Sequence, residues 1–282
     1  MRQPWGNPWP ALLFHPIFRN TLMIFNRSLA ATVAVTLSYG TASAADLATI
    51  NGATFTQSVA QIGATYEAQG YRCERLVVMD PEDGRIDEAG CALWKEEFSF
   101  SDADPRTMWT MRYQKDNEML IIVFDEHPDE DRVLMIGQAT FFEDAAVEMS
   151  TTDFMHDRLS VVAEIQPTFG AFDASEDESE LCFLMTKEAT VLTPTDLPVS
   201  ALEESQSFLG SQISPAAILC ERWMNRKRDA VADFVHSDAG PAYARKVLYF
   251  AQDGKAQQYM DMLWDVQAVV DWNQGPLRAE GK

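Results

Sequence analysis

Four cysteines are the residues whose type and spacing point most directly to chemistry in this sequence. They are Cys73, Cys91, Cys182 and Cys220. An even number of cysteines in an exported chain favours disulfide bonds, and four of them allow three pairings. Cys73 and Cys91 lie nine residues on either side of Glu82, the centre of a D-P-E-D-G turn signal, so a hairpin would place them opposite each other. We predict the pairs Cys73–Cys91 and Cys182–Cys220. The alternative is a zinc site, but its usual C-x-x-C spacing is missing from the sequence.

Oxygen ligands for a metal ion gather in two acidic segments, residues 125–131 and 173–180. In the second segment Asp173, Ser175 and Asp177 alternate as the ligands of some calcium loops do. Glu178 stands where an EF-hand loop has the glycine that lets the chain turn. The pattern makes these three residues calcium candidates, and a solvated acidic loop is the alternative.

Histidine and serine offer little else for catalysis. The histidines His127, His156 and His236 lack the H-x-x-x-H spacing of many metal sites, and the adjacency of His236 and Ser237 does not by itself make a catalytic pair. The G-x-S-x-G, P-loop and G-x-G-x-x-G patterns are missing from the sequence. Carboxylates for glycoside cleavage are recognised by their distance in space, so the 43 acidic residues carry no signal in sequence. No catalytic residue and no cofactor is predicted.

The first forty-four residues differ in composition from the rest. They contain no Asp, Glu or Lys and carry three arginines. The run Ser28–Leu37 is small and apolar, and it leads to Ala42-Ser43-Ala44. A basic start, a short apolar stretch and an A-x-A site are typical of a cleaved export signal, whereas a membrane span needs about twenty residues. We expect cleavage after Ala44, with translation starting at Met23 or, as the alternative, a longer leader from Met1.

Acidic residues dominate the expected mature chain. The sequence has 43 Asp and Glu against 22 Lys and Arg, a net charge of −21, and loss of the three leader arginines would make it −24. Such a charge repels nucleic acid, whose binding needs cations that neutralise phosphates, and it favours cationic partners. We expect a periplasmic or secreted protein without nucleic acid and without a stable membrane anchor after cleavage. The cationic run Arg226–Arg228 is interpreted as a solvated helix face.

Hydrophobic periodicity predicts the elements. A T-x-x-Q capping box at Thr54 opens a helix over Thr54–Gln69. Alternation puts Trp109, Met111 and Tyr113 on one strand face, and the run Met119–Phe124 reads as a central strand. Further predicted strands are Arg75–Met79, Leu93–Phe100, Arg132–Phe142 with a bulge at Gly137, Arg158–Gln166 and Leu181–Thr186. Predicted helices follow at Ser200–Leu209, from Ser214 to Phe234, at Ala242–Gln252 and at Lys255–Trp272.

These elements predict an α+β fold: an N-terminal helix, an antiparallel β-meander of about six to eight strands, and a C-terminal helical layer. Residues 45–282 would form one mature domain, with the sheet at about 71–190 and the helical part at about 198–273.

Residues 53–91 read as a helix, Gly70-Tyr71, a strand, an Asp-Gly turn and another strand. This order resembles the first part of a PepSY-type periplasmic module, a family associated with peptidase inhibition. The resemblance covers under a fifth of the mature chain, and PepSY modules do not normally carry the pair Cys73 and Cys91.

Aromatic side chains are the remaining candidates for binding. Most are expected in the core, but a few that line a groove between sheet and helices would make an apolar ligand pocket. The tryptophans concerned are Trp94, Trp109, Trp223, Trp264 and Trp272. The sequence leaves open whether the protein is an enzyme and favours a non-enzymatic exported protein that binds a partner or a small apolar ligand. The alternative is an exported hydrolase that acts through carboxylates, with or without the help of calcium. Such an enzyme would show two facing carboxyl groups with raised pKa in a deep cleft.

Overall fold

A computed structural model of the chain describes residues 47–98 (without 77), 106–126, 131–142, 178–192, 194–200, 230–235, 237, 239–252 and 255–272. All of them belong to one compact unit, Thr41–Lys282. The predicted leader and the predicted strand Arg158–Gln166 lie outside these residues. So do most of the helix predicted to begin at Ser200, where only Ser200 itself is described, and most of the one predicted from Ser214. The leader and the single mature domain stay predictions.

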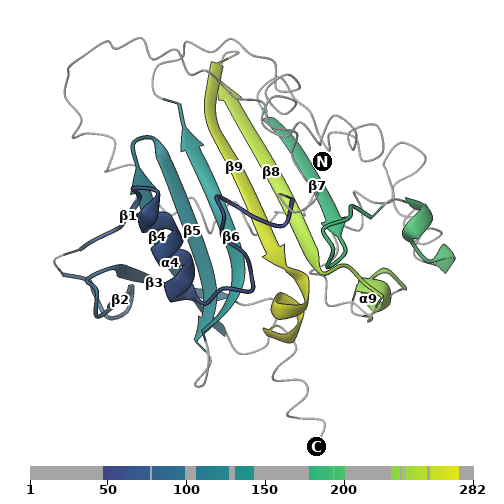
Figure 1. Cartoon of the computed structure of the whole chain (residues 1–282), viewed down its shortest axis with the longest axis horizontal. Coiled ribbons are helices and arrows are strands. Elements are labelled where there is room, and N and C mark those ends of the chain that lie inside the picture. The colour runs from purple at the N-terminus through teal and green to yellow at the C-terminus, as the bar shows by residue number, and fades with distance from the viewer. Residues whose placement is uncertain are drawn as a thin grey trace, which may run out of the picture. The chain divides into compact units, whose positions relative to one another are not determined.

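Nine strands of the described residues form one antiparallel sheet (Figure 1). Its strands follow in the order β2-β3-β4-β5-β6-β9-β8-β7, and β1 pairs with β4 outside this path. The meander predicted for the middle of the chain is therefore present as β2 to β6, while the hairpin of β8 and β9 lies between β6 and β7. The strands are β1 (Arg72–Cys73), β2 (Gly84–Ile86), β3 (Ala92–Phe98), β4 (Arg106–Lys115), β5 (Glu118–Glu126), β6 (Asp131–Phe141), β7 (Glu178–Met185), β8 (Tyr243–Gln252) and β9 (Lys255–Asp265).

The predicted C-terminal helical layer is wrong, and with it the α+β fold class. The two helices predicted at Ala242–Gln252 and Lys255–Trp272 are the paired strands β8 and β9, and only residues 266–272 continue as a helix. Tyr259 and Leu263 are buried as predicted, but residues four apart share a face in a strand as well as in a helix. The dipeptide Asp253-Gly254 between the two strands is a strong hairpin signal in the sequence.

Helix α4 (Val59–Ala68) is the main helix of the described residues, and it starts later than predicted. Ser58 caps it and forms a reciprocal capping box with Gln61. At the predicted start, the Gln57 side chain does reach back to the amide of Thr54 at 2.8 Å, but this closes a separate turn. The shorter elements are the 3-10 helix η1 (Pro194–Asp196) and α9 (Ala230–Val235), which is the described end of the helix predicted from Ser214.

Two further strand predictions are corrected. The described residues of the predicted strand at 75–79, which exclude residue 77, lie in no strand, and the strand at this place is β1, which ends at Cys73 and pairs with β4. The bulge predicted at Gly137 lies instead at Leu134, because Val123 pairs with Met135 and Phe124 with Val133. The alternation in β4 and the central strand at Met119–Phe124 are confirmed.

Both faces of the sheet are apolar. On the face that α4 covers, here called the helix face, the ring of Tyr66 lies 5.5 Å from that of Tyr113. On the opposite face the register forms rows such as Met119–Ala139–Met260 and Val123–Met135–Trp264, and none of these six side chains is more than 8% exposed. A strand buried on both faces reads as a continuous apolar run, which is what Met119–Phe124 shows.

Candidate functional site

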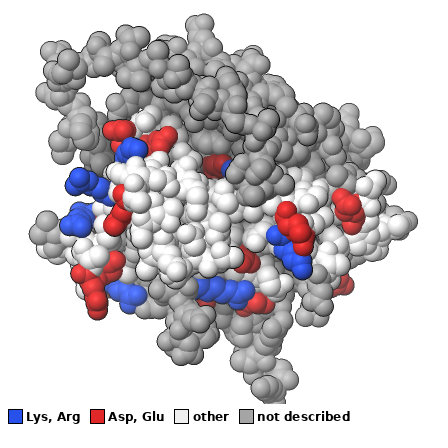
Figure 2. Space-filling model, in the orientation of Figure 1, with Lys and Arg blue, Asp and Glu red and all other residues white. Residues whose placement is uncertain are grey.

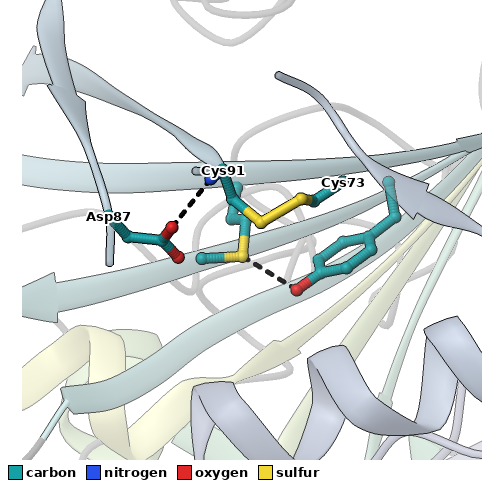
Figure 3. The surroundings of a disulfide bond; sticks show 5 residues. Cys73, Asp87 and Cys91 are labelled. Atoms are coloured by element: carbon teal, nitrogen blue, oxygen red, sulfur yellow. Dashed lines mark hydrogen bonds between the residues drawn. A yellow bond between two sulfur atoms is a disulfide. The ribbon is translucent and has the colours of Figure 1, made fainter. Parts of the chain in front are cut away.

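Cys73 and Cys91 form a disulfide bond, as predicted (Figure 3). The geometry differs from the expected hairpin. Strands β1 and β3 pair one after the other with the same edge of β4, where Cys73 lies opposite Tyr113 and Leu93 opposite Met111. The Asp87 carboxylate accepts a hydrogen bond from the Cys91 amide at 2.7 Å. The bond thus joins β1 to the residue just before β3, and these two strands share β4 as a neighbour.

The other predicted site residues are mostly not described. Cys182 is disulfide-bonded, and its expected partner Cys220 lies outside the described residues. So do the calcium candidates Asp173, Ser175 and Asp177, the three histidines, Trp223 and the cationic run Arg226–Arg228. Within the part of the chain that the structure describes, no three potential metal ligands gather at one place. Of the tryptophans, Trp109, Trp264 and Trp272 are buried as expected of core residues.

Arg245 and Asp261 form a buried ion pair on the helix face. They are diagonal neighbours on the paired strands β8 and β9, because Val247 lies opposite Asp261. Nε of Arg245 donates to Oδ1 of Asp261 at 2.8 Å, and Nη2 donates to Oδ2 at 2.6 Å. The two side chains are 8% and 5% exposed. Two parallel charge-assisted bonds are the strong form of such a pair.

The surroundings keep this pair charged. Burial lowers the pKa of Arg245, but the adjacent Asp261 carboxylate outweighs burial and raises it. The Tyr259 hydroxyl donates to Oδ2 of Asp261 at 3.3 Å. Nη1 of Arg245 donates to the backbone carbonyl of Leu47 at 2.9 Å. The three side chains of Arg245, Asp261 and Tyr259, here called the polar cluster, therefore lie inside an otherwise apolar face.

Residues 47–55, here called the strap, cross the helix face above the polar cluster (Figure 1). Ile50 and Ala53 exchange two backbone hydrogen bonds around a turn in which Asn51 and Gly52 have positive φ. The Gln69 side chain donates to the Asn51 carbonyl at 2.7 Å and ties this turn to the end of α4. The ring of Phe55 stacks on that of Tyr243 at 5.7 Å. The strap is thus held to the sheet by a few specific contacts.

Four buried side-chain atoms of the described residues lack a hydrogen-bond partner: the Tyr66 hydroxyl, Nε1 of Trp109, the Thr140 hydroxyl and Nδ2 of Asn51. Of these, the Thr140 hydroxyl lies on β6 and the Asn51 nitrogen lies in the strap. Thr140 lies opposite Tyr259 on the neighbouring strand β9, so it adjoins the polar cluster. Each buried polar group without a partner costs roughly 1–3 kcal/mol and calls for an explanation.

A separate cleft of about 600 Å³ opens at the surface beside α9. Asp196 and Asp233 line it, but the Ser237 hydroxyl there donates to the Phe234 carbonyl at 2.7 Å. Asp265 is a carboxyl group whose pKa is raised by burial, but it does not line this cleft. Its side chain caps the helix at 266–272 and accepts a hydrogen bond from the Ala268 amide. The described lining residues are Asp196, Leu197, Pro198, Ser200, Asp233, Phe234, Ser237 and Ala239.

Sequence reasoning missed the polar cluster. Its signal is present, since Arg245 and Asp261 sit at positions two residues from apolar Val247 and Leu263 in period-two segments around Asp253-Gly254. A charged residue in the inward series of a strand indicates a buried partner.

Comparison with known proteins assigns no family, because no family model, no curated protein and no solved structure matches the chain. The resemblance of residues 53–91 to a PepSY-type module therefore stays one of sequence pattern. None of the helices in the described ranges is long and apolar enough to span a bilayer.

Proposed function

We propose that this chain is an exported accessory protein that binds a small apolar ligand or an apolar part of a partner. The observation that carries the proposal is the helix face, where a charged and hydrogen-bonded cluster lies within apolar surface under an irregular segment. Ligand sites combine mainly apolar walls with a few placed polar groups, and the helix face has both components.

Export is supported by the composition of residues 1–44 and by the Cys73–Cys91 bond. Disulfides form and persist in oxidising compartments and are rare in the cytosol. The test is fractionation of the host followed by peptide mapping without reduction. We expect the protein in the periplasm or medium, with Ala45 as its first residue and intact Cys73–Cys91. Recovery of the untrimmed chain with free thiols from the cytosol would contradict the export part.

Ligand binding is tested by native mass spectrometry of the protein isolated from its own host. The expected result is a population heavier than the polypeptide by the mass of a bound molecule, which organic solvent releases and the second stage of the spectrometer identifies. A chain that carries no added mass at any gentle activation energy, and retains no compound from an extract of host lipids and small molecules, would contradict the binding function.

The distribution of charge leaves an uncharged area on one side of the molecule. Figure 2 shows, in the orientation of Figure 1, a broad area without charged residues in the middle of the view, with Lys, Arg, Asp and Glu around its margin. An uncharged area within a chain of net charge −21 is where apolar surface of a ligand or partner can approach without desolvating charges.

A further inference from the structure

The open cleft beside α9 has walls that the chain holds in place. On one side, the amide and the hydroxyl of Ser237 both donate to the Phe234 carbonyl, at 3.0 and 2.7 Å, and the Gly240 amide donates to the Ser237 carbonyl at 2.9 Å. A Cβ at Gly240 would lie 2.5 Å from the Phe234 carbonyl oxygen, so this turn is tightly packed. On the other side, the ring of Pro198 fixes its φ beside the buried Leu197. The cleft is therefore preformed.

The lining of the cleft combines apolar side chains with acidic charge. Leu197 and Phe234 are 7% and 8% exposed, so the core fixes both side chains where they line the cleft. The described lining residues include the two aspartates Asp196 and Asp233 and no lysine or arginine. The whole chain carries a net charge of −21. Local and overall charge therefore both favour a ligand that is a cation with an apolar body.

An organic cation fits this lining better than a metal ion does. Calcium takes six or more oxygen ligands, whereas no three potential metal ligands gather within the described ranges. The guanidinium of an arginine is flat and weakly hydrated, and it pairs with a carboxylate through two parallel hydrogen bonds. Its methylene groups can lie along apolar surface at the same time. An arginine side chain thus matches both components of the cleft.

An exposed valine extends the apolar surface at the rim of the cleft. Val199 lies between the lining residues Pro198 and Ser200 and is 69% exposed. A single exposed valine is ordinary in itself, but this one adjoins a cleft with apolar lining. An apolar residue next to the arginine in a partner would cover it and remove its surface from water.

We infer that the cleft beside α9 binds an arginine side chain from an extended segment of a partner protein. The guanidinium donates to the carboxylate of Asp233, and the methylene groups lie on Leu197 and Phe234. An apolar neighbour of the arginine covers Val199. This inference goes beyond the proposed function, because it concerns a different surface and a ligand of different chemistry, and either can fail without the other.

The test uses two peptides that differ only in charge. The probe is acetyl-Leu-Arg-Leu-amide, titrated into the exported, disulfide-bonded protein at about 150 mM salt, where exposed charges are screened beyond about 8 Å. The matched peptide carries citrulline, which has the shape of arginine without its charge. We expect the arginine peptide to bind with a Kd about fivefold lower or better. In protein with isotope-labelled valine methyl groups, its addition should shift the signals of Val199.

Two pairs of variants separate binding in the cleft from attraction to the whole chain. Asp233→Asn removes one negative charge from the cleft, and Glu82→Gln removes one from the turn before β2. Ala239→Arg adds a cation to the lining, and Ala89→Arg adds one to the β2–β3 turn. All four side chains are exposed, so each variant should fold with nearly unchanged stability.

We expect Asp233→Asn to raise the Kd of the arginine peptide about three- to fivefold, which is the effect of one exposed ion pair. Ala239→Arg should raise it about tenfold or more, because a like charge then meets the guanidinium. Glu82→Gln and Ala89→Arg should leave it nearly unchanged, since screening confines their effect to their own surroundings.

Three results would overturn the inference. An arginine peptide that binds no better than the citrulline peptide would show that the charge is not recognised. Equal effects of Asp233→Asn and Glu82→Gln, or of Ala239→Arg and Ala89→Arg, would show that only the net charge attracts the peptide. Absence of binding at millimolar peptide would refute the cleft as an arginine site. All three leave the proposed function standing, because that is tested by the ligand carried by protein from the host.

Discussion

Breaking the ion pair of Arg245 and Asp261 should cost far more than removing it completely. With side chains 8% and 5% exposed, either single replacement, Arg245→Met or Asp261→Leu, leaves a desolvated charge without its partner. Such a change costs about 3–5 kcal/mol. In the double variant both charges are gone and apolar side chains fill the space, so the remaining loss is two hydrogen bonds, from Arg245 to Leu47 and from Tyr259 to Asp261, about 2 kcal/mol.

The assay is urea unfolding of the oxidised protein, followed by tryptophan fluorescence. The four proteins form a double-mutant cycle, and we expect a coupling energy on the order of 5 kcal/mol. Arg132 and Asp271 supply a matched control, because they form an ion pair at 3.1 Å with side chains 43% and 32% exposed. Arg132→Met should cost under about 1 kcal/mol.

Two results would refute this reasoning. If Arg245→Met destabilises no more than Arg132→Met, then solvent reaches the polar cluster and it is not part of a dry face. If the double variant loses as much as the sum of the two single variants, then the residues act independently and the bidentate geometry is wrong.

Three further predictions concern stability. Replacing Cys73 and Cys91 by alanine should lower the unfolding free energy by about 3 kcal/mol, because the bond closes a loop with a sequence separation of 18; urea midpoints unchanged from the disulfide-bonded protein would contradict this. Gly63→Ala should cost about 1–3 kcal/mol, since its Cβ would lie within 2.3 Å of the Tyr113 hydroxyl, and Tyr113→Phe in the same chain should recover part of that loss in thermal unfolding. Burial raises the pKa of Asp265 above its ordinary 3.8, so the folded state binds the proton more tightly and loses stability as pH rises above that value. The variant Asp265→Asn keeps the hydrogen bond that caps Ala268 but cannot lose a proton. The difference between its Tm and that of the unmodified chain should therefore grow, in favour of the variant, from about pH 4 to about pH 7. A difference that stays constant would show that this carboxyl does not titrate as its burial implies.

Local patterns predicted those parts of the fold that depend on neighbours in sequence. The alternation of Trp109, Met111 and Tyr113 fixes which side chains face α4, and the run Met119–Phe124 indicates burial on both faces. The disulfide followed from the spacing of Cys73 and Cys91, although the strands that bring them together are neighbours of β4 and not of each other.

The wrong secondary-structure predictions come from sequence patterns that fit both a helix and a strand, or two different helix starts. Tyr259 and Leu263 are four residues apart, which is close to one helical turn and also an even number of strand residues. Only a wider window separates the two readings, because Tyr243, Arg245 and Val247 alternate with other residues on one side of Asp253-Gly254, and Tyr259, Asp261 and Leu263 do so on the other. The predicted start of α4 was wrong for a similar reason, because both Thr54-x-x-Gln57 and Ser58-x-x-Gln61 match a capping box.

Even if the sequence had been predicted to form the β8–β9 hairpin, the prediction would have paired Asp261 with the wrong residue. Next to the turn, Gln252 pairs with Lys255 and Ala251 with Ala256, and continuing this register would set Lys246 opposite Asp261. That pairing reads as an ordinary cross-strand ion pair. The register shifts by one residue between Phe250 and Ala251, and a shift of one residue moves every later side chain to the other face. Asp261 therefore meets Arg245 on the helix face, beneath the strap, and the existence of the candidate site depends on a single extra residue in β9.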